Sequence, residues 1–106
     1  MDSNKLVKIT VDALEEIKAF DIKVLDVAKL ASMFDYIIIA SASSSRQTKA
    51  LANNVQEKVK KAGGNVFSLE GEQTGEWLLV DLGGVIVHIM QPEAREYYNL
   101  EALWAG

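Results

Sequence analysis

Residues able to perform acid–base chemistry are sparse in this chain, and the single histidine, His88, is the first candidate. General-base catalysis would need its imidazole beside a nucleophile and an orienting carboxylate. Asp81 falls on the same face of a predicted hairpin, but it lies across and along the hairpin, which contains no Ser or Thr. A lone histidine in a strand is more often a structural hydrogen-bonding group. The pattern therefore favours a structural role for His88 over catalysis, any functional role would be that of a contact, and we predict no catalytic residue.

A serine-rich turn at residues 41–45 is the second candidate site. It joins a predicted strand to the start of a predicted helix, where backbone amides and the helix dipole favour an anion such as phosphate. The turn lacks the glycines and the lysine of a P-loop, and serines commonly cap helices. Capping is the favoured interpretation. Nucleotide binding or nucleotidyl transfer at this turn is the alternative function.

A metal site would need two or three carboxylates gathered on adjacent strands. Asp26, Asp35 and Asp81 fall on three separate predicted strands, and the sequence contains no Asp-x-Asp pair. It also contains no cysteine, which excludes thiolate ligands and disulfides. We therefore expect neither a metal nor a cofactor.

The segment 77–90 predicts a β-hairpin around Gly83-Gly84 that sorts its side chains onto two faces. One face pairs Leu82 with Val85, Val80 with Val87, and Leu78 with Ile89; the other pairs Trp77 with Met90, Leu79 with His88, and Asp81 with Ile86. The aliphatic face suits burial against a helix. The mixed face resembles a protein-binding surface. A second helix covering the mixed face is an equally weighted alternative.

Length and charge limit the possible functions. At 106 residues the chain fits one domain, residues 1–106, and its net charge of −4 argues against binding free nucleic acid. The N-terminus does not resemble a signal peptide, and no apolar stretch approaches the roughly 20 residues that cross a bilayer, so we expect a cytoplasmic protein. A few basic residues share one predicted helix and are interpreted as solvation: Arg46, Lys49, Lys58, Lys60 and Lys61.

The hydrophobic pattern predicts helix, strand, strand, helix, strand, strand, strand, helix. The first helix covers residues 4–19, with Ser3 or Asn4 as its cap, and strands follow at 23–27 and 35–41, the latter in the middle of the sheet. A capping box at 44–47 begins a helix that ends at Gly63-Gly64, and a strand at 66–69 should run parallel to the strand before that helix. We expect a layered α/β domain with a mixed sheet of about five strands and flanking helices.

An aromatic segment follows the hairpin. Pro92 suits the first turn of a last short helix, which would carry Arg95, Tyr97 and Tyr98 and be followed by Leu100 and Trp104. Adjacent tyrosines point about 100° apart on a helix, so they cannot both enter one core. We expect one of them to be available to a partner.

With these residues in view, the chain resembles the ribosomal silencing factor family, or Iojap-related proteins, from Leu6 to Trp104. The motifs that carry the resemblance are Asp26-Val27, Asp35-Tyr36-Ile37-Ile38-Ile39-Ala40-Ser41, Ser44-Ser45-Arg46-Gln47, Glu70-Gly71 with Trp77, Asp81 and Gly83, Val85-Ile86-Val87-His88-Ile89, and Tyr97-Tyr98-Leu100-Glu101-Leu103-Trp104. Their order and spacing together make the match specific. One departure is Gly84, where many relatives have an acidic residue.

The resemblance implies a non-enzymatic factor with a nucleotidyltransferase-like fold that lacks the catalytic carboxylates. Such a factor binds the large ribosomal subunit through the ribosomal protein numbered fourteen, blocks joining of the small subunit and slows translation when nutrients are scarce. Homodimers are common in the family. Our hypothesis is that the mixed face of the hairpin docks on that ribosomal protein, so the expected partner-binding residues are Trp77, Leu79, Asp81 and His88, extended by Arg95, Tyr98 and Leu100. A self-associating module that uses the same face is the second alternative.

Overall fold

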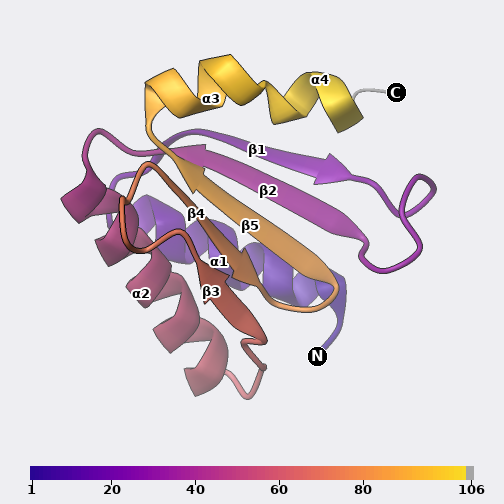
Figure 1. Cartoon of the computed structure of the whole chain (residues 1–106). Helices are drawn as coiled ribbons and strands as arrows, with labels where there is room; N and C mark the ends of the chain where they lie inside the picture. Colours follow the sequence, from indigo (N-terminus) through magenta and orange to yellow (C-terminus); the bar gives the residue numbers. More distant parts are fainter. Residues whose placement is uncertain (105–106) are drawn as a thin grey trace.

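The structure is a computed structural model that describes residues 1–104. Its elements are α1 (Ser3–Glu16), β1 (Phe20–Asp26), β2 (Tyr36–Ser41), α2 (Ser45–Lys61), β3 (Ser68–Glu70), β4 (Trp77–Asp81), β5 (Val85–Met90), α3 (Pro92–Tyr98) and α4 (Leu100–Trp104). The strands form one mixed sheet in the order β1-β2-β5-β4-β3. Helices α1 and α2 cover one face of the sheet, and α3 and α4 lie on the other side (Figure 1). The predicted layered α/β architecture is confirmed.

Helix α1 begins earlier than predicted because Asp2 caps it. The Asp2 carboxylate accepts the Lys5 backbone N–H at 2.8 Å. Ser3 and Asn4, the predicted caps, are instead engaged with other parts of the chain: Ser3 donates its hydroxyl to a carboxylate oxygen of Asp35 at 2.6 Å. The helix ends at Glu16 and not at residue 19, because Lys18 adopts a left-handed conformation with φ 63°.

Helix α2 confirms the predicted capping hydroxyl. Ser44 Oγ accepts the Gln47 backbone N–H at 3.1 Å. The Gln47 side chain reaches back to the N–H of Ser43 at 2.7 Å, one residue before the position that an ordinary capping box would use. Its amide nitrogen also donates to the Ile17 carbonyl at 3.0 Å. Gln47 therefore joins the start of α2 to the end of α1.

The hairpin register is as predicted, with Leu79 opposite His88 and Val80 opposite Val87. The position of β2 needs a correction: β2 is an interior strand, but the middle of the sheet is β5, which pairs with β2 on one side and β4 on the other. Strand β3 runs in the same direction as β2, as the crossover predicted, because β2 is parallel to β5 and two antiparallel pairings follow. Strands β5 and β4 nevertheless lie between them.

Two hydrophobic clusters lie on opposite faces of the sheet. The larger lies beneath α1 and α2 and includes the aliphatic face of the hairpin, with Leu78, Val80 and Val87 almost fully buried. The smaller has Val27, Ile37, Ile39 and Met90 at its centre and is covered in part by Ala94, Leu100 and Trp104. The second cluster explains why the C-terminal segment folds back over the sheet.

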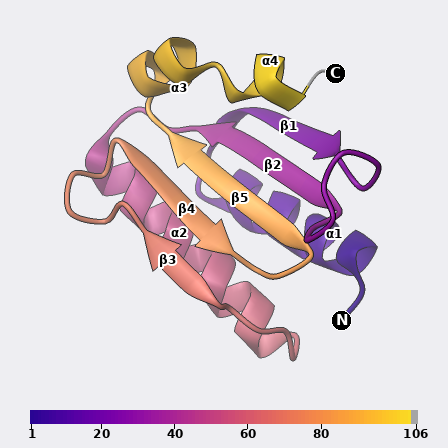
Figure 2. The same ribbon diagram turned by 45° about the vertical axis from the view of Figure 1, so that its right-hand side comes forward.

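The C-terminal segment forms two helices where one was expected. Pro92 occupies the first turn of α3, as predicted. Asn99 then adopts a left-handed conformation with φ 47° and separates α3 from α4. The two helices run in succession along the β1 side of the sheet (Figure 2). Among the described residues, no helix is long and apolar enough to cross a membrane.

Candidate docking surface

Trp77 and Tyr98 form the centre of an aromatic surface on the mixed face of the hairpin. Trp77 begins β4 and is half-buried, and Tyr98 ends α3 with 54% of its surface exposed. Their ring centroids are 4.6 Å apart, with the planes tilted by 45°. Tyr97 packs edge-on against Tyr98 at 5.0 Å and is 81% exposed. The strand and the C-terminal helix thus contribute to one continuous aromatic surface.

His88 lies beside Trp77, on the neighbouring strand β5 and the same face of the sheet. The Trp77 indole N–H donates to His88 Nδ1 at 2.9 Å, and only 8% of the His88 surface is exposed. Burial lowers the pKa of the imidazole from 6.5 to about 4, since desolvation penalises the charged form. A neutral imidazole with an unprotonated Nδ1 is the form that can accept this hydrogen bond. The geometry supports the predicted structural role of His88.

Leu79 and Asp81 continue the surface along β4, and both are half-buried. Asp81 Oδ1 accepts the Gly83 backbone N–H at 2.8 Å, so the carboxylate also holds the hairpin turn. Gly84 is the second glycine of that turn. A Cβ built on Gly84 would lie 2.4 Å from Ser3 Oγ. The Ser3 side chain therefore occupies the space that a side chain at position 84 would need.

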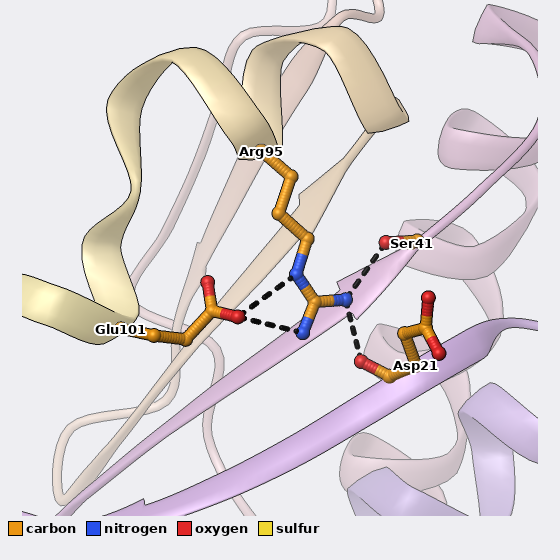
Figure 3. A network of polar contacts seen from close by, with 4 residues as sticks. All are labelled: Asp21, Ser41, Arg95 and Glu101. Atoms are coloured by element: carbon orange, nitrogen blue, oxygen red, sulfur yellow. Dashed lines mark hydrogen bonds and ion pairs between the residues drawn. The ribbon is translucent and has the colours of Figure 1, made fainter.

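Arg95 and Leu100, the other two predicted contact residues, lie mainly inside the molecule. The Arg95 side chain is 11% exposed and its guanidinium binds Glu101, Ser41 and the Asp21 carbonyl (Figure 3). Leu100 is half-buried and packs on the smaller cluster. The seven predicted residues are therefore unequally exposed and spread along the sheet: Arg95 meets Ser41, which pairs with Met90 at one end of β5, whereas Asp81 pairs with Ile86 near the other end.

Both interpretations of the mixed face describe part of it. The C-terminal helices cover the smaller cluster around Ile37, Ile39 and Met90. Trp77 and Leu79 are left half-buried along β4. The covered part supplies the core that holds the C-terminal segment, and the open part carries the aromatic surface.

An open groove adjoins the aromatic surface and was not predicted. It has a volume of about 610 Å³ and lies between the start of α3 and the residue before β4. Its lining includes Glu76, Gln91, Glu93, Tyr97 and Tyr98. Tyr97 was recognised in the sequence as part of an aromatic pair, but no local pattern shows that α3 returns to the start of β4.

The serine turn is explained by contacts within the chain. Ser41 is 2% exposed and its hydroxyl binds Arg95 at 2.7 Å. Ser44 caps α2, and Ser43 binds the Gln47 side chain. These contacts favour capping over an anion site. Within residues 1–104, no group of three or more His, Cys, Asp or Glu side chains is arranged to hold a metal.

Comparison with known proteins identifies the family. The model of the family "ribosomal silencing factor during starvation" matches residues 1–106. The ribosomal silencing factor RsfS of Chromobacterium violaceum is 50% identical over 106 residues, which are 100% of this chain and 87% of that protein. RsfS of Haemophilus influenzae is 47% identical over 94% of this chain and 98% of its own length. A crystal structure of a Chromobacterium violaceum protein has a TM-score of 0.97 and 50% identity, covering 100% of this chain and 88% of that one. These matches confirm the resemblance in the sequence motifs, and the chain belongs to the ribosomal silencing factor family.

Proposed function

We propose that this protein silences ribosomes by docking on the large subunit, through the ribosomal protein numbered fourteen, on the face that meets the small subunit. Occupation of that face blocks subunit joining by steric exclusion and represses translation when nutrients are limiting. The action needs no catalysis and takes place on cytoplasmic ribosomes. Family membership supports the silencing role, and the family resemblance supplies the partner.

The aromatic surface is the observation that carries the proposed docking mode. Tyr97 and Tyr98 are 81% and 54% exposed, and the Tyr98 ring packs at a tilt against Trp77. Aromatic side chains held in place by packing lose little conformational entropy on binding and dominate the energetics of many interfaces. Trp77, Leu79 and Tyr98 would contact the partner directly. His88, Arg95 and Leu100 would contribute from beneath, and Asp81 would hold the end of β4.

The net charge of −4 is consistent with a protein partner and not with free RNA. An acidic surface is repelled by the phosphates of ribosomal RNA, so approach is favoured only where a ribosomal protein is exposed.

The aromatic surface is also available to a second copy of the chain. A homodimer would then compete with the ribosome, because mass action divides the protein between the two complexes.

Co-sedimentation with purified ribosomal subunits tests the proposal. The protein is run on sucrose gradients with large subunits, with small subunits, and with a subunit-joining reaction. We expect migration with large subunits only and a smaller yield of joined ribosomes. Trp77→Ala should weaken binding by about thirtyfold, which corresponds to a loss of about 2 kcal/mol for an aromatic anchor.

Phe67→Ala is the matched control. Phe67 is an aromatic residue that is 67% exposed, and it lies next to Leu82 and Gly83, away from the aromatic surface. It should bind and silence like the parent. Far-ultraviolet circular dichroism verifies that both variants are folded. Parent-like binding by Trp77→Ala would show that the docking surface is assigned wrongly, and absence of the parent from the large-subunit peak would refute the proposed partner.

A further inference from the structure

One side chain, Arg95, links four separate elements of the fold. Its Nη1 donates to Ser41 Oγ on β2 at 2.7 Å and to the Asp21 carbonyl on β1. Its Nε and Nη2 both donate to Glu101 Oε2 on α4, at 3.4 and 3.2 Å. Arg95 itself lies on α3, so its guanidinium joins both C-terminal helices to the β1–β2 edge of the sheet (Figure 3).

The C-terminal helices depend on such attachments. Within residues 92–104, no side chain is fully buried, and the two helices have 7 and 5 residues. Helices this short are unstable alone in water. Apart from Arg95, their attachments are partial: Leu100 packs on the smaller cluster, and Trp104 meets the Phe34 ring edge-on at 5.8 Å. Loss of the Arg95 contacts would therefore remove a large share of the interactions that attach α3 and α4 to the sheet.

The part of the sheet that accepts the Arg95 hydrogen bonds has an unusual backbone conformation. Asp21 lies where the β1–β2 register shifts between Phe20 and Lys23, and its φ is 50°. A residue other than glycine rarely adopts this left-handed conformation, and here it accompanies a carbonyl that accepts from Arg95. Ser41, the other acceptor on the sheet, is 2% exposed. Backbone and side chain together satisfy a guanidinium that is largely removed from water.

We propose that Arg95 is a positioning residue, which with Glu101 clamps α3 and α4 onto the sheet and thereby holds Tyr98 over Trp77 ready for docking. The docking role of this clamp rests on the function proposed above. Arg95 acts through Tyr98 and does not contact the partner. Because the clamp already orders the C-terminal helices in the free protein, binding does not have to order them. Less of the interaction energy is therefore lost.

The geometry requires arginine. Four N–H groups of one planar guanidinium reach three acceptors on β1, β2 and α4. A lysine ammonium keeps the positive charge but cannot reproduce this fork. Arg95→Lys therefore separates a clamp from a charge that simply attracts an anionic partner. Glu101→Gln weakens the clamp from the other side, and Glu96→Gln is its control, with the same change in charge at an exposed residue of α3.

The clamp is measured first in the free protein, by amide hydrogen exchange. In Arg95→Lys and Glu101→Gln, amides of residues 95–104 should exchange about tenfold faster, which corresponds to about 1.4 kcal/mol. Amides of β5 should exchange as in the parent. The Trp77 indole resonances, which sense the Tyr98 ring at 4.6 Å, should shift in both variants and not in Glu96→Gln. Unchanged exchange in Arg95→Lys would overturn the clamp.

Binding to large subunits then tests positioning. We expect affinity about tenfold lower in Arg95→Lys and in Glu101→Gln, with Glu96→Gln within about twofold of the parent. In a Tyr98→Ala background, Arg95→Lys should add little, because both changes remove the same contact. Additive losses, or normal binding by Arg95→Lys, would overturn the positioning role. If the parent failed to bind, the proposed function and the docking role would both fall, while the exchange data would still decide whether the clamp exists.

Discussion

Acidification should destabilise this protein through His88. The folded chain holds the imidazole neutral with a pKa of about 4, whereas the ordinary value is 6.5. Below pH 6.5 the unfolded chain binds a proton that the folded chain rejects, so the free energy of unfolding falls as the pH is lowered. The stability that depends on a neutral His88 is fully present above pH 6.5 and is lost progressively as the pH falls to about 4.

The magnitude follows from the size of the pKa shift. Between pH 6.5 and pH 5 the interval is 1.5 units, and each unit corresponds to about 1.36 kcal/mol, so His88 should cost about 2 kcal/mol at pH 5. The full shift, 6.5 minus 4, corresponds to about 3 kcal/mol below pH 4. Protonation of Nδ1 would also remove the acceptor of the Trp77 N–H.

Urea unfolding at pH 7.5, 6.0 and 5.0 measures the effect, with His88→Asn as the reference. Asn cannot titrate, and its side-chain oxygen can replace Nδ1 as an acceptor. Subtracting its pH dependence from that of the parent removes the contribution of the carboxylates. We expect the parent to lose about 2 kcal/mol more than the variant between pH 7.5 and 5.0. Equal losses in the two proteins would refute the argument that burial keeps His88 neutral.

Two further predictions concern glycines. Gly84→Ala should lower the free energy of unfolding by about 1 kcal/mol, because the new Cβ would lie 2.4 Å from the Ser3 hydroxyl and displace it from its hydrogen bond with Asp35. This penalty should largely disappear in a Ser3→Ala background. An equal penalty in that background would contradict the explanation. Gly75→Ala should cost about 2 kcal/mol or more, because φ is +74° and the new Cβ would lie 2.5 Å from Ser45 Cβ. Gly63→Ala, at φ +92° with nothing within 4 Å, isolates the backbone part of that cost and should lose less in thermal unfolding.

Local patterns in the sequence were sufficient for the hairpin and most of the helices. Alternation from Trp77 to Met90 and a turn at Gly83-Gly84 specify the β4–β5 register, because the residues concerned are close in sequence and the side-chain period of a strand is two. Capping of α2 by Ser44 was predictable for the same reason. The cap of α1 was placed one or two residues late: Asp2 caps the helix locally, and the hydroxyl of Ser3, a predicted cap, is engaged by Asp35, 32 residues away.

The candidate site shows the same division. Trp77, Leu79 and His88 were assigned to one face from strand alternation alone. Their exposure could not be predicted, because it depends on where the C-terminal helices lie over the sheet. The sequence determined that a mixed apolar face exists, and the tertiary structure decided that part of it is covered and part is open.

Arg95 illustrates the limit most clearly. It was expected to contact a partner as an extension of the mixed face of the hairpin. In the fold its guanidinium meets Ser41 and Asp21, which precede it by 54 and 74 residues. The sequence by itself determined the elements and the faces of their side chains, because those depend on neighbours along the chain. Strand order, coverage of the mixed face and the contacts of Arg95 were decided by tertiary structure, because they depend on packing between segments far apart in sequence.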